Sequence, residues 1–194
     1  MLVVEGHFRF YAIFDGHGSK GHDVSLFVKD NLPKLLLMDD NFKKGPEMMP
    51  KLLTNAFLEM ERRIEAADQR GEISARLSGT TATVVIHDML QNVMTVAHVA
   101  DSCAVLGKEK DGVWMAELLT REHKPHLKAS EACRQSQTWQ DEKARITKAG
   151  GRVVFDGYAN HRIYNGRLFE ALQWLELCVR SKYPGSWPLF SCLT

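Results

Sequence analysis

The chain has 194 residues, of which 44% are hydrophobic and 25% are charged, and its formal net charge is +1. This length and composition predict one globular domain with a hydrophobic core, and the balanced charge argues against a nucleic-acid or anionic-membrane partner. The four cysteines stand far apart without a Cys-x-x-Cys pair, which argues against a zinc site or a disulfide framework. Reduced thiols, with no signal peptide or membrane-spanning segment in the sequence, predict a cytoplasmic or nuclear protein.

The first part of the chain predicts one strand followed by two helices. Residues 8–14 form a short aromatic and aliphatic run, which is typical of a buried strand. The pattern over residues 23–37 is helical, and Pro33 is expected to kink or interrupt that helix. Pro50 is expected to open the second helix. The apolar side chains that recur at helical spacing on this second helix are expected to pack in the core: Leu53, Ala56, Phe57, Met60 and Ile64.

The next part of the chain predicts a run of strands and one short helix. Four strands are expected, at residues 80–87, 93–99, 104–108 and 113–119. Asn92 and residues 108–112 are expected to form turns between them. A helix over residues 141–149 is expected to end at Gly150, whose missing Cβ suits a left-handed cap, and a further strand follows at 152–155. Because the strands are grouped apart from the helices, the predicted class is α+β rather than an alternating parallel sheet.

Residues 11–18, Tyr-Ala-Ile-Phe-Asp-Gly-His-Gly, are the segment richest in chemistry. An apolar strand ends there in an acid, so Asp15 would lie at the rim of a sheet beside the bare backbone of two glycines. This arrangement offers a place for a metal-bound anion, with His17 beside it as a proton donor, because histidine exchanges protons near neutral pH. A plain tight turn is the alternative interpretation, since Asp-Gly is a common turn dipeptide.

Four further motifs follow in order along the chain. They read Ser-Gly-Thr-Thr-Ala at 78–82, Val-Ala-Asp-Ser-Cys-Ala-Val at 99–105, Leu-Thr-Arg-Glu-His-Lys-Pro at 119–125 and Glu-Lys-Ala-Arg-Ile at 142–146. Together with residues 11–18, this ordered set resembles the metal-dependent protein serine/threonine phosphatases of type 2C, the PPM family. The resemblance covers roughly residues 8–167.

The resemblance implies a fold, a reaction and a set of site residues. The fold would be a partial four-layer α-β-β-α sandwich, in which antiparallel sheets are flanked by helices. The reaction would be hydrolysis of phosphoserine and phosphothreonine in a phosphoprotein substrate by water activated by two Mg²⁺ or Mn²⁺ ions. The Asp15 carboxylate and the Gly16 carbonyl would bind metal, and His17 would protonate the departing oxygen. Glu122 stands where the family usually has the aspartate of an additional, weaker metal site.

The resemblance assigns structural roles to other residues of the motifs. Gly79, Thr80 and Thr81 would start a core strand, with small side chains that allow close packing. Asp101 would support a turn rather than touch the metals. His123 is expected to lie in an exposed turn, because a proline separates it from the next histidine.

Departures from the family pattern predict an incomplete metal site in this chain. The family's upstream acidic motif and its phosphate-binding arginine have no counterpart, and no aspartate follows Asp156. The predicted organisation is a partial phosphatase domain over residues 1–167 and a divergent tail over residues 168–194, with a helix at 168–180. The tail would be either that of a truncated or spliced isoform or the product of a mis-predicted exon boundary. Strands missing from a sandwich leave open sheet edges, which a protein partner is expected to cover.

Two functional hypotheses follow from the motifs and the departures. The first is a metal-dependent serine/threonine phosphatase. The second is a catalytically dead pseudophosphatase or truncated isoform that binds phosphoproteins or partners. The two differ in their dependence on Asp15: its replacement by alanine would abolish metal uptake and turnover in the enzyme, whereas surface binding by the module would survive.

Overall fold

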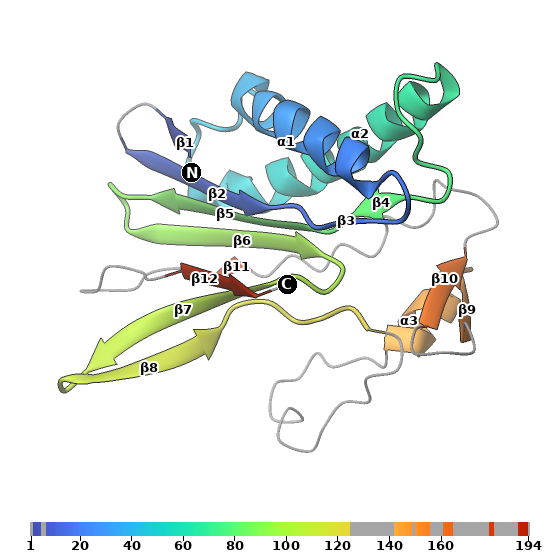
Figure 1. Ribbon diagram of the computed structural model, residues 1–194. Coiled ribbons are helices and arrows are strands. Elements are labelled where there is room, and N and C mark those ends of the chain that lie inside the picture. The colour runs from blue at the N-terminus through green and yellow to red at the C-terminus, as the bar shows by residue number, and fades with distance from the viewer. Residues whose placement is uncertain are drawn as a thin grey trace. The chain divides into compact units, whose positions relative to one another are not determined.

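The computed structural model describes residues 2–4, 7–124, 142–148, 150–155, 161–164, 179–180 and 190–193 (Figure 1). The chain divides into two compact units, of which the first comprises residues 1–122 and 175–194 and the second comprises residues 123–174. The first unit holds three of the five motifs in full. No helix in these described ranges is both long and apolar enough to cross a membrane.

The first unit is built on a five-stranded antiparallel sheet. Its strands are β1 (Leu2–Val4), β2 (Phe8–Ile13), β5 (Ala82–Asp88), β6 (Val93–Val99) and β11 (Val179–Arg180), in the order β1-β2-β5-β6-β11. Strands β5 and β6 are rich in β-branched residues and are buried along nearly their whole length, as such residues favour. Asn92, with a φ of 51°, lies in the turn that joins them, as predicted. In the register of this sheet Phe10 pairs with Ile86, and Ala82 pairs with Val99.

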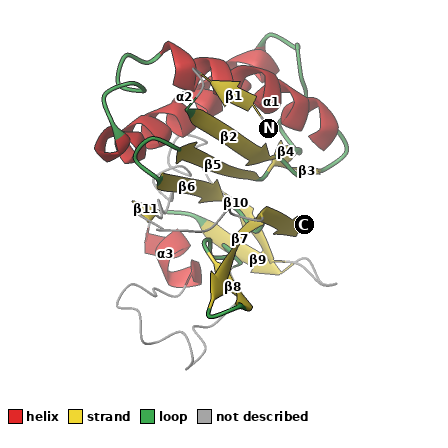
Figure 2. Ribbon diagram, turned by 90° about the vertical axis from the view of Figure 1, so that its left-hand side faces the viewer, coloured by secondary structure: helices red, strands yellow, loops and turns green. Residues whose placement is uncertain are grey.

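Two helices cover one face of this sheet (Figures 1 and 2). Helix α1 spans Gly21–Met38, and helix α2 spans Met49–Gln69 directly after a short 3₁₀ turn, η1 (Pro46–Met48). The buried side chains of α1 recur every four residues and form one stripe: Val24, Val28, Leu32 and Leu36. Helix α1 continues through Pro33, so the predicted interruption is wrong. The buried leucines before and after Pro33 hold both turns of the helix against the sheet, which offsets the hydrogen bond that proline cannot make.

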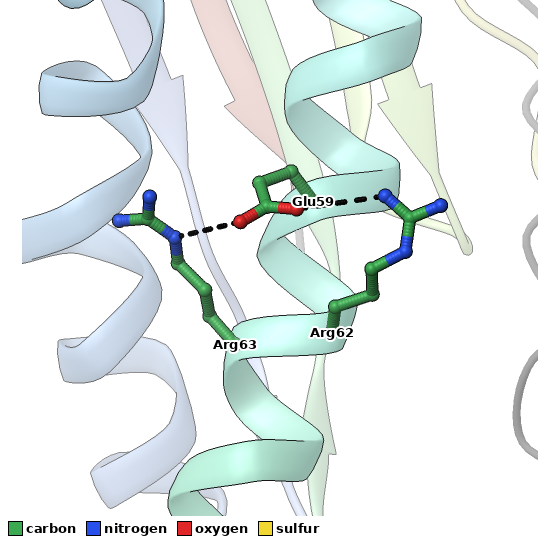
Figure 3. A network of polar contacts seen from close by, with 3 residues as sticks. All are labelled: Glu59, Arg62 and Arg63. Carbon is green, nitrogen blue, oxygen red and sulfur yellow. Dashed lines mark hydrogen bonds and ion pairs between the residues drawn. The ribbon is translucent and has the colours of Figure 1, made fainter.

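Helix α2 has the buried face that its apolar spacing predicted. Four of the five predicted side chains are buried, and the fifth, Ile64, is partly buried against the same core. On the outer surface Glu59 lies between two arginines (Figure 3), 3.5 Å from Arg62 Nη1 and 3.2 Å from Arg63 Nε. Exposed pairs at this spacing contribute about 0.3–0.5 kcal/mol each, so the network supports the helix without deciding the fold.

Glu61, on the same helix, is expected to make stability depend on pH. Burial raises the pKa of its carboxyl above the ordinary value of 4.5, and the charge of Glu65 one turn later raises it further. The ionised form therefore opposes folding above pH 4.5, with the full penalty above the folded-state pKa. Glu61→Gln should increase the free energy of unfolding at pH 7 and flatten its rise as the pH falls through that window.

The measurement is urea unfolding between pH 4 and pH 8. Glu65→Gln is the matched control, because it removes only the like-charge repulsion, worth about 0.2–0.5 kcal/mol, and leaves Glu61 half-buried. Equal stability of the wild type and Glu61→Gln at pH 7 would contradict the prediction.

A second antiparallel sheet packs on the other face of the first. Its strands are β12 (Phe190–Leu193), β7 (Cys103–Lys110) and β8 (Val113–Leu118), in that order. Asp111 and Gly112, with φ values of 53° and 78°, form the predicted turn between β7 and β8. The side chains buried between the two sheets are Val85, Met94 and Val96 from the first, with Ala104, Leu106 and Leu119. The first unit thus has helix, sheet and sheet layers, and the predicted α+β class with antiparallel sheets is confirmed.

The second unit contains helix α3 (Glu142–Lys148) and the antiparallel pair β9 (Arg152–Phe155) and β10 (His161–Tyr164). Gly150 has a φ of 86°, and the N–H of Gly151 donates to the Ile146 carbonyl at 2.9 Å. This is the left-handed cap that the sequence predicts. His123, expected in an exposed turn, is instead buried.

The end of the chain contributes strands to the first unit. Strand β11 pairs with β6, and strand β12 pairs with β7. The helix predicted for residues 168–180 is therefore wrong at its end, where Val179–Arg180 pair with a strand; residues 168–178 lie outside the described residues. The division of the chain at residues 167 and 168 stays a prediction.

Candidate functional site

The predicted metal ligands and the predicted proton donor lie together at the end of β2. Asp15 follows this strand, and Gly16 and His17 then form the short strand β3, which pairs with β4 (Gly79–Thr80). In this register Gly16 lies opposite Thr80, and His17 lies opposite Gly79. The pairing brings the first two motifs side by side, and Asp15, Gly16 and His17 are all exposed to solvent.

Glycines allow the backbone to pack closely around this loop. A Cβ at Gly16 would lie 2.3 Å from the carbonyl oxygen of Gly21, at the start of α1, and one at Gly79 would lie 2.8 Å from His17 Nε2. Both distances are shorter than real Cβ contacts allow. The imidazole of His17 therefore lies directly against the backbone of Gly79, and the loop lies directly against α1.

A buried pair of hydroxyls ties the third motif to Asp15. The Asp15 N–H donates to Thr81 Oγ1 at 3.0 Å, and the Thr81 N–H donates to the Asp15 carbonyl at 2.8 Å. Thr81 Oγ1 is 2.7 Å from Ser102 Oγ, and Thr83 Oγ1 donates to the Ser102 carbonyl at 2.9 Å. Thr81 is 3% exposed and Ser102 is 2% exposed, so water does not compete for the two bonds made by Ser102. The structural role predicted for Thr81 consists of these hydrogen bonds to Asp15 and Ser102. Ser102 was not singled out from the sequence.

The loop after His17 is held by the residues that precede β4. The backbone N–H of Lys20 donates to Ser78 Oγ at 2.9 Å. Gly18, with a φ of 83°, passes so close to the backbone of Leu77 and Ser78 that a Cβ would lie 2.4 Å from the Leu77 carbonyl oxygen. The turn from β3 into α1 is thereby fixed on both sides.

Glu122 lies at the end of the segment that follows β8. This segment is anchored to β7, because the Leu119 N–H donates to the Ala104 carbonyl at 2.8 Å and the Ala104 N–H donates to Thr120 Oγ1 at 2.8 Å. The Arg121 N–H donates to Nε2 of the fully buried His98 at 3.4 Å. Glu122 itself is half-buried.

The donor chemistry of the loop suits a hard cation, but the described residues supply only part of a two-metal site. A carboxylate at Asp15 and a carbonyl at Gly16 are oxygen donors of the kind that Mg²⁺ and Mn²⁺ prefer. Within the described ranges, no three His, Cys, Asp or Glu side chains are grouped so that they could hold a metal ion. Asp101 is exposed in the turn after β6, where Ala100 has a φ of 75°, so its expected support of that turn stays a prediction.

Comparison with known proteins connects this arrangement to one family. The family model described as Protein phosphatase 2C matches residues 4–174. Probable protein phosphatase 2C 27 of Arabidopsis thaliana is 34% identical over 154 residues, which cover 79% of this chain and 33% of that protein. Protein phosphatase 2C homolog 3 of Schizosaccharomyces pombe is 35% identical over 146 residues, covering 75% of this chain and 29% of that protein. The chain thus spans about a third of the length of these curated relatives.

Solved structures share the fold. A serine-threonine phosphatase 2C from Toxoplasma gondii superposes with a TM-score of 0.59 at 19% identity, covering 93% of this chain and 66% of that one. A C. elegans sex determining protein gives a TM-score of 0.58 at 22% identity, covering 80% of this chain and 33% of that one. With a family match over residues 4–174 and relatives above 30% identity, this chain belongs to the protein phosphatase 2C family.

Proposed function

We propose that this chain carries out Mg²⁺- or Mn²⁺-dependent hydrolysis of phosphoserine and phosphothreonine in phosphoproteins. The observation that carries the proposal is the exposed triplet Asp15, Gly16 and His17, whose backbone is held by Thr81 and by the pairing of β3 with β4. A carboxylate, a backbone carbonyl and an imidazole stand there in consecutive positions. These are the groups needed to hold a hard cation and to protonate a departing alkoxide.

Each residue of the triplet has a role in this proposal. The Asp15 carboxylate and the Gly16 carbonyl would hold the cation, which supplies an acidified water and neutralises phosphoryl oxygens. His17 donates a proton to the serine or threonine oxygen as it leaves. Glu122 is the candidate for a weaker metal position. The described residues give only part of a two-metal donor set, so further carboxylates would have to come from residues outside the described ranges or from a second copy.

The proposal predicts that Asp15→Ala abolishes phosphatase activity. The measurement is hydrolysis of p-nitrophenyl phosphate with and without Mn²⁺, by protein whose folding is checked by circular dichroism. The wild type should show turnover that requires Mn²⁺, and Asp15→Ala should show none, because the cation loses its carboxylate ligand. Asp30→Ala, which removes an exposed acid from α1 outside the motifs, should keep the wild-type rate.

A second candidate function, a non-catalytic binding module, is favoured by the apolar surface of β8. Val113, Trp114, Met115 and Leu118 on this strand are each about half exposed, between 48% and 61%. Apolar side chains gathered on one strand suit contact with another protein, which would cover this sheet edge. Folded wild-type protein that shows no turnover above Asp15→Ala, and that binds a phosphoserine peptide equally well with or without Asp15, would favour the module over the enzyme.

A further inference from the structure

The carboxylate of Asp15 is oriented through its backbone. Among the described residues, this carboxylate accepts no hydrogen bond and makes no ion pair. Its main chain, in contrast, is held at both ends of the residue by Thr81, whose hydroxyl accepts from the Asp15 N–H and whose own N–H donates to the Asp15 carbonyl. The orientation of the Asp15 carboxylate relative to the loop therefore depends on the position of Thr81.

Thr81 is itself held by Ser102. The Oγ–Oγ distance of 2.7 Å is that of a strong hydroxyl hydrogen bond, and both side chains are buried. The carbonyl of Ser102 accepts from Thr83 Oγ1, which fixes the turn after β6 to strand β5. A chain of contacts thus runs from Thr83 through Ser102 and Thr81 to Asp15, and each buried polar atom in it is costly to leave unsatisfied.

We propose that Thr81 and Ser102 are positioning residues, which place the Asp15 carboxylate for a metal ion by holding its backbone. This inference rests on the proposed function for the identity of the ligand, a divalent cation, but the placement itself is a property of the protein without metal. Neither hydroxyl touches the cation or the substrate in this arrangement. Replacing a residue that orients a metal ligand without touching the metal typically changes metal affinity by about 10–100-fold.

The test compares Thr81→Val, which keeps the shape of the side chain and removes the hydroxyl, with Thr81→Ser, which keeps the hydroxyl. Thr95→Val is the matched control, because Thr95, on β6, is similarly buried at 1% exposure and none of the hydrogen bonds described above joins it to Asp15. The first readout is hydrogen exchange of the Asp15 and His17 amides by NMR without metal. The second is Mn²⁺ affinity by electron paramagnetic resonance.

Thr81→Val should speed exchange of the Asp15 amide and weaken Mn²⁺ binding by about 10-fold or more, whereas Thr81→Ser and Thr95→Val should do neither. Ser102→Ala should produce the same two effects and replaces Thr81→Val in the test if that variant does not fold. Unchanged Asp15 exchange in a folded Thr81→Val protein would overturn the proposal. If the wild type bound no Mn²⁺, the proposed metal chemistry would fail, and the exchange data alone would still decide whether Thr81 and Ser102 hold Asp15.

Discussion

Replacing His17 with alanine is expected to slow Mn²⁺-dependent hydrolysis of a phosphoserine peptide by about 10²–10⁴-fold, and that of p-nitrophenyl phosphate far less. The reason is the leaving group. A serine alkoxide is a strong base that must be protonated as the P–O bond breaks, whereas p-nitrophenolate leaves without that help. His17 is exposed, and its ring lies against Gly79 rather than in the core, so the substitution removes a proton donor without removing packing.

The measurement is kcat/KM for both substrates, and the ratio of the two is the informative number. His22→Ala is the matched control: this neighbouring histidine is also exposed and lies 3.2 Å from Asp23 on α1. It should leave the ratio unchanged. An equal loss on both substrates in His17→Ala would mean that the imidazole acts on metal binding or on the loop, and the role of proton donor would be wrong.

Gly18→Ala is expected to lower the free energy of unfolding by about 2–4 kcal/mol, whereas Gly71→Ala should cost only about 1–2 kcal/mol. Both glycines have a left-handed backbone, with φ values of 83° and 72°, so both variants share the strain of placing a Cβ there. They differ in their surroundings. At Gly71 nothing lies within 4 Å of the new Cβ, whereas at Gly18 it would lie 2.4 Å from the Leu77 carbonyl oxygen and 2.8 Å from the Ser78 Cα.

Urea unfolding of the two variants measures this difference, and NMR shifts of the His17 amide report on the loop. Because the atoms in the way belong to the backbone, relief of the clash requires the loop to move away from Leu77 and Ser78. That movement should also break the bond from the Lys20 N–H to Ser78 Oγ. Equal destabilisation by Gly18→Ala and Gly71→Ala would show that the loop can move away from Leu77 and Ser78 without loss of stability. That result would contradict the close packing of the loop at Gly18.

Local periodicity was sufficient to predict most of the secondary structure. The apolar spacing of α2 and the glycine cap after α3 depend on residues within a few positions of one another, and both are confirmed. The interruption predicted at Pro33 is wrong because the packing of the apolar stripe around it outweighs a local preference, whereas the predicted kink stays a prediction. The strand predicted over residues 80–87 is divided at Thr81, since its N–H and hydroxyl bond to Asp15 rather than to a strand partner.

The site was less accessible to sequence reasoning than the fold. Asp15, Gly16 and His17 are consecutive in one motif, so their proximity in space follows directly from the sequence. Ser102 acts across 21 positions on Thr81, which acts across 66 positions on Asp15, and no periodic pattern reports contacts of that range. The only sequence signal was that Thr81 and Ser102 are small hydroxyl residues within two of the ordered motifs.

The pairing of β11 with β6 and of β12 with β7 determines when the two sheets are completed during synthesis of the protein. The partner strands are complete once residue 110 has been synthesised, but the strands that border them come from residues 179–193. Those residues leave the ribosome after the strands with which they pair. Both sheets therefore have an open edge during translation until residues 179–193 have been synthesised and can pair with β6 and β7. During that interval the nascent chain is most exposed to wrong pairing with other chains.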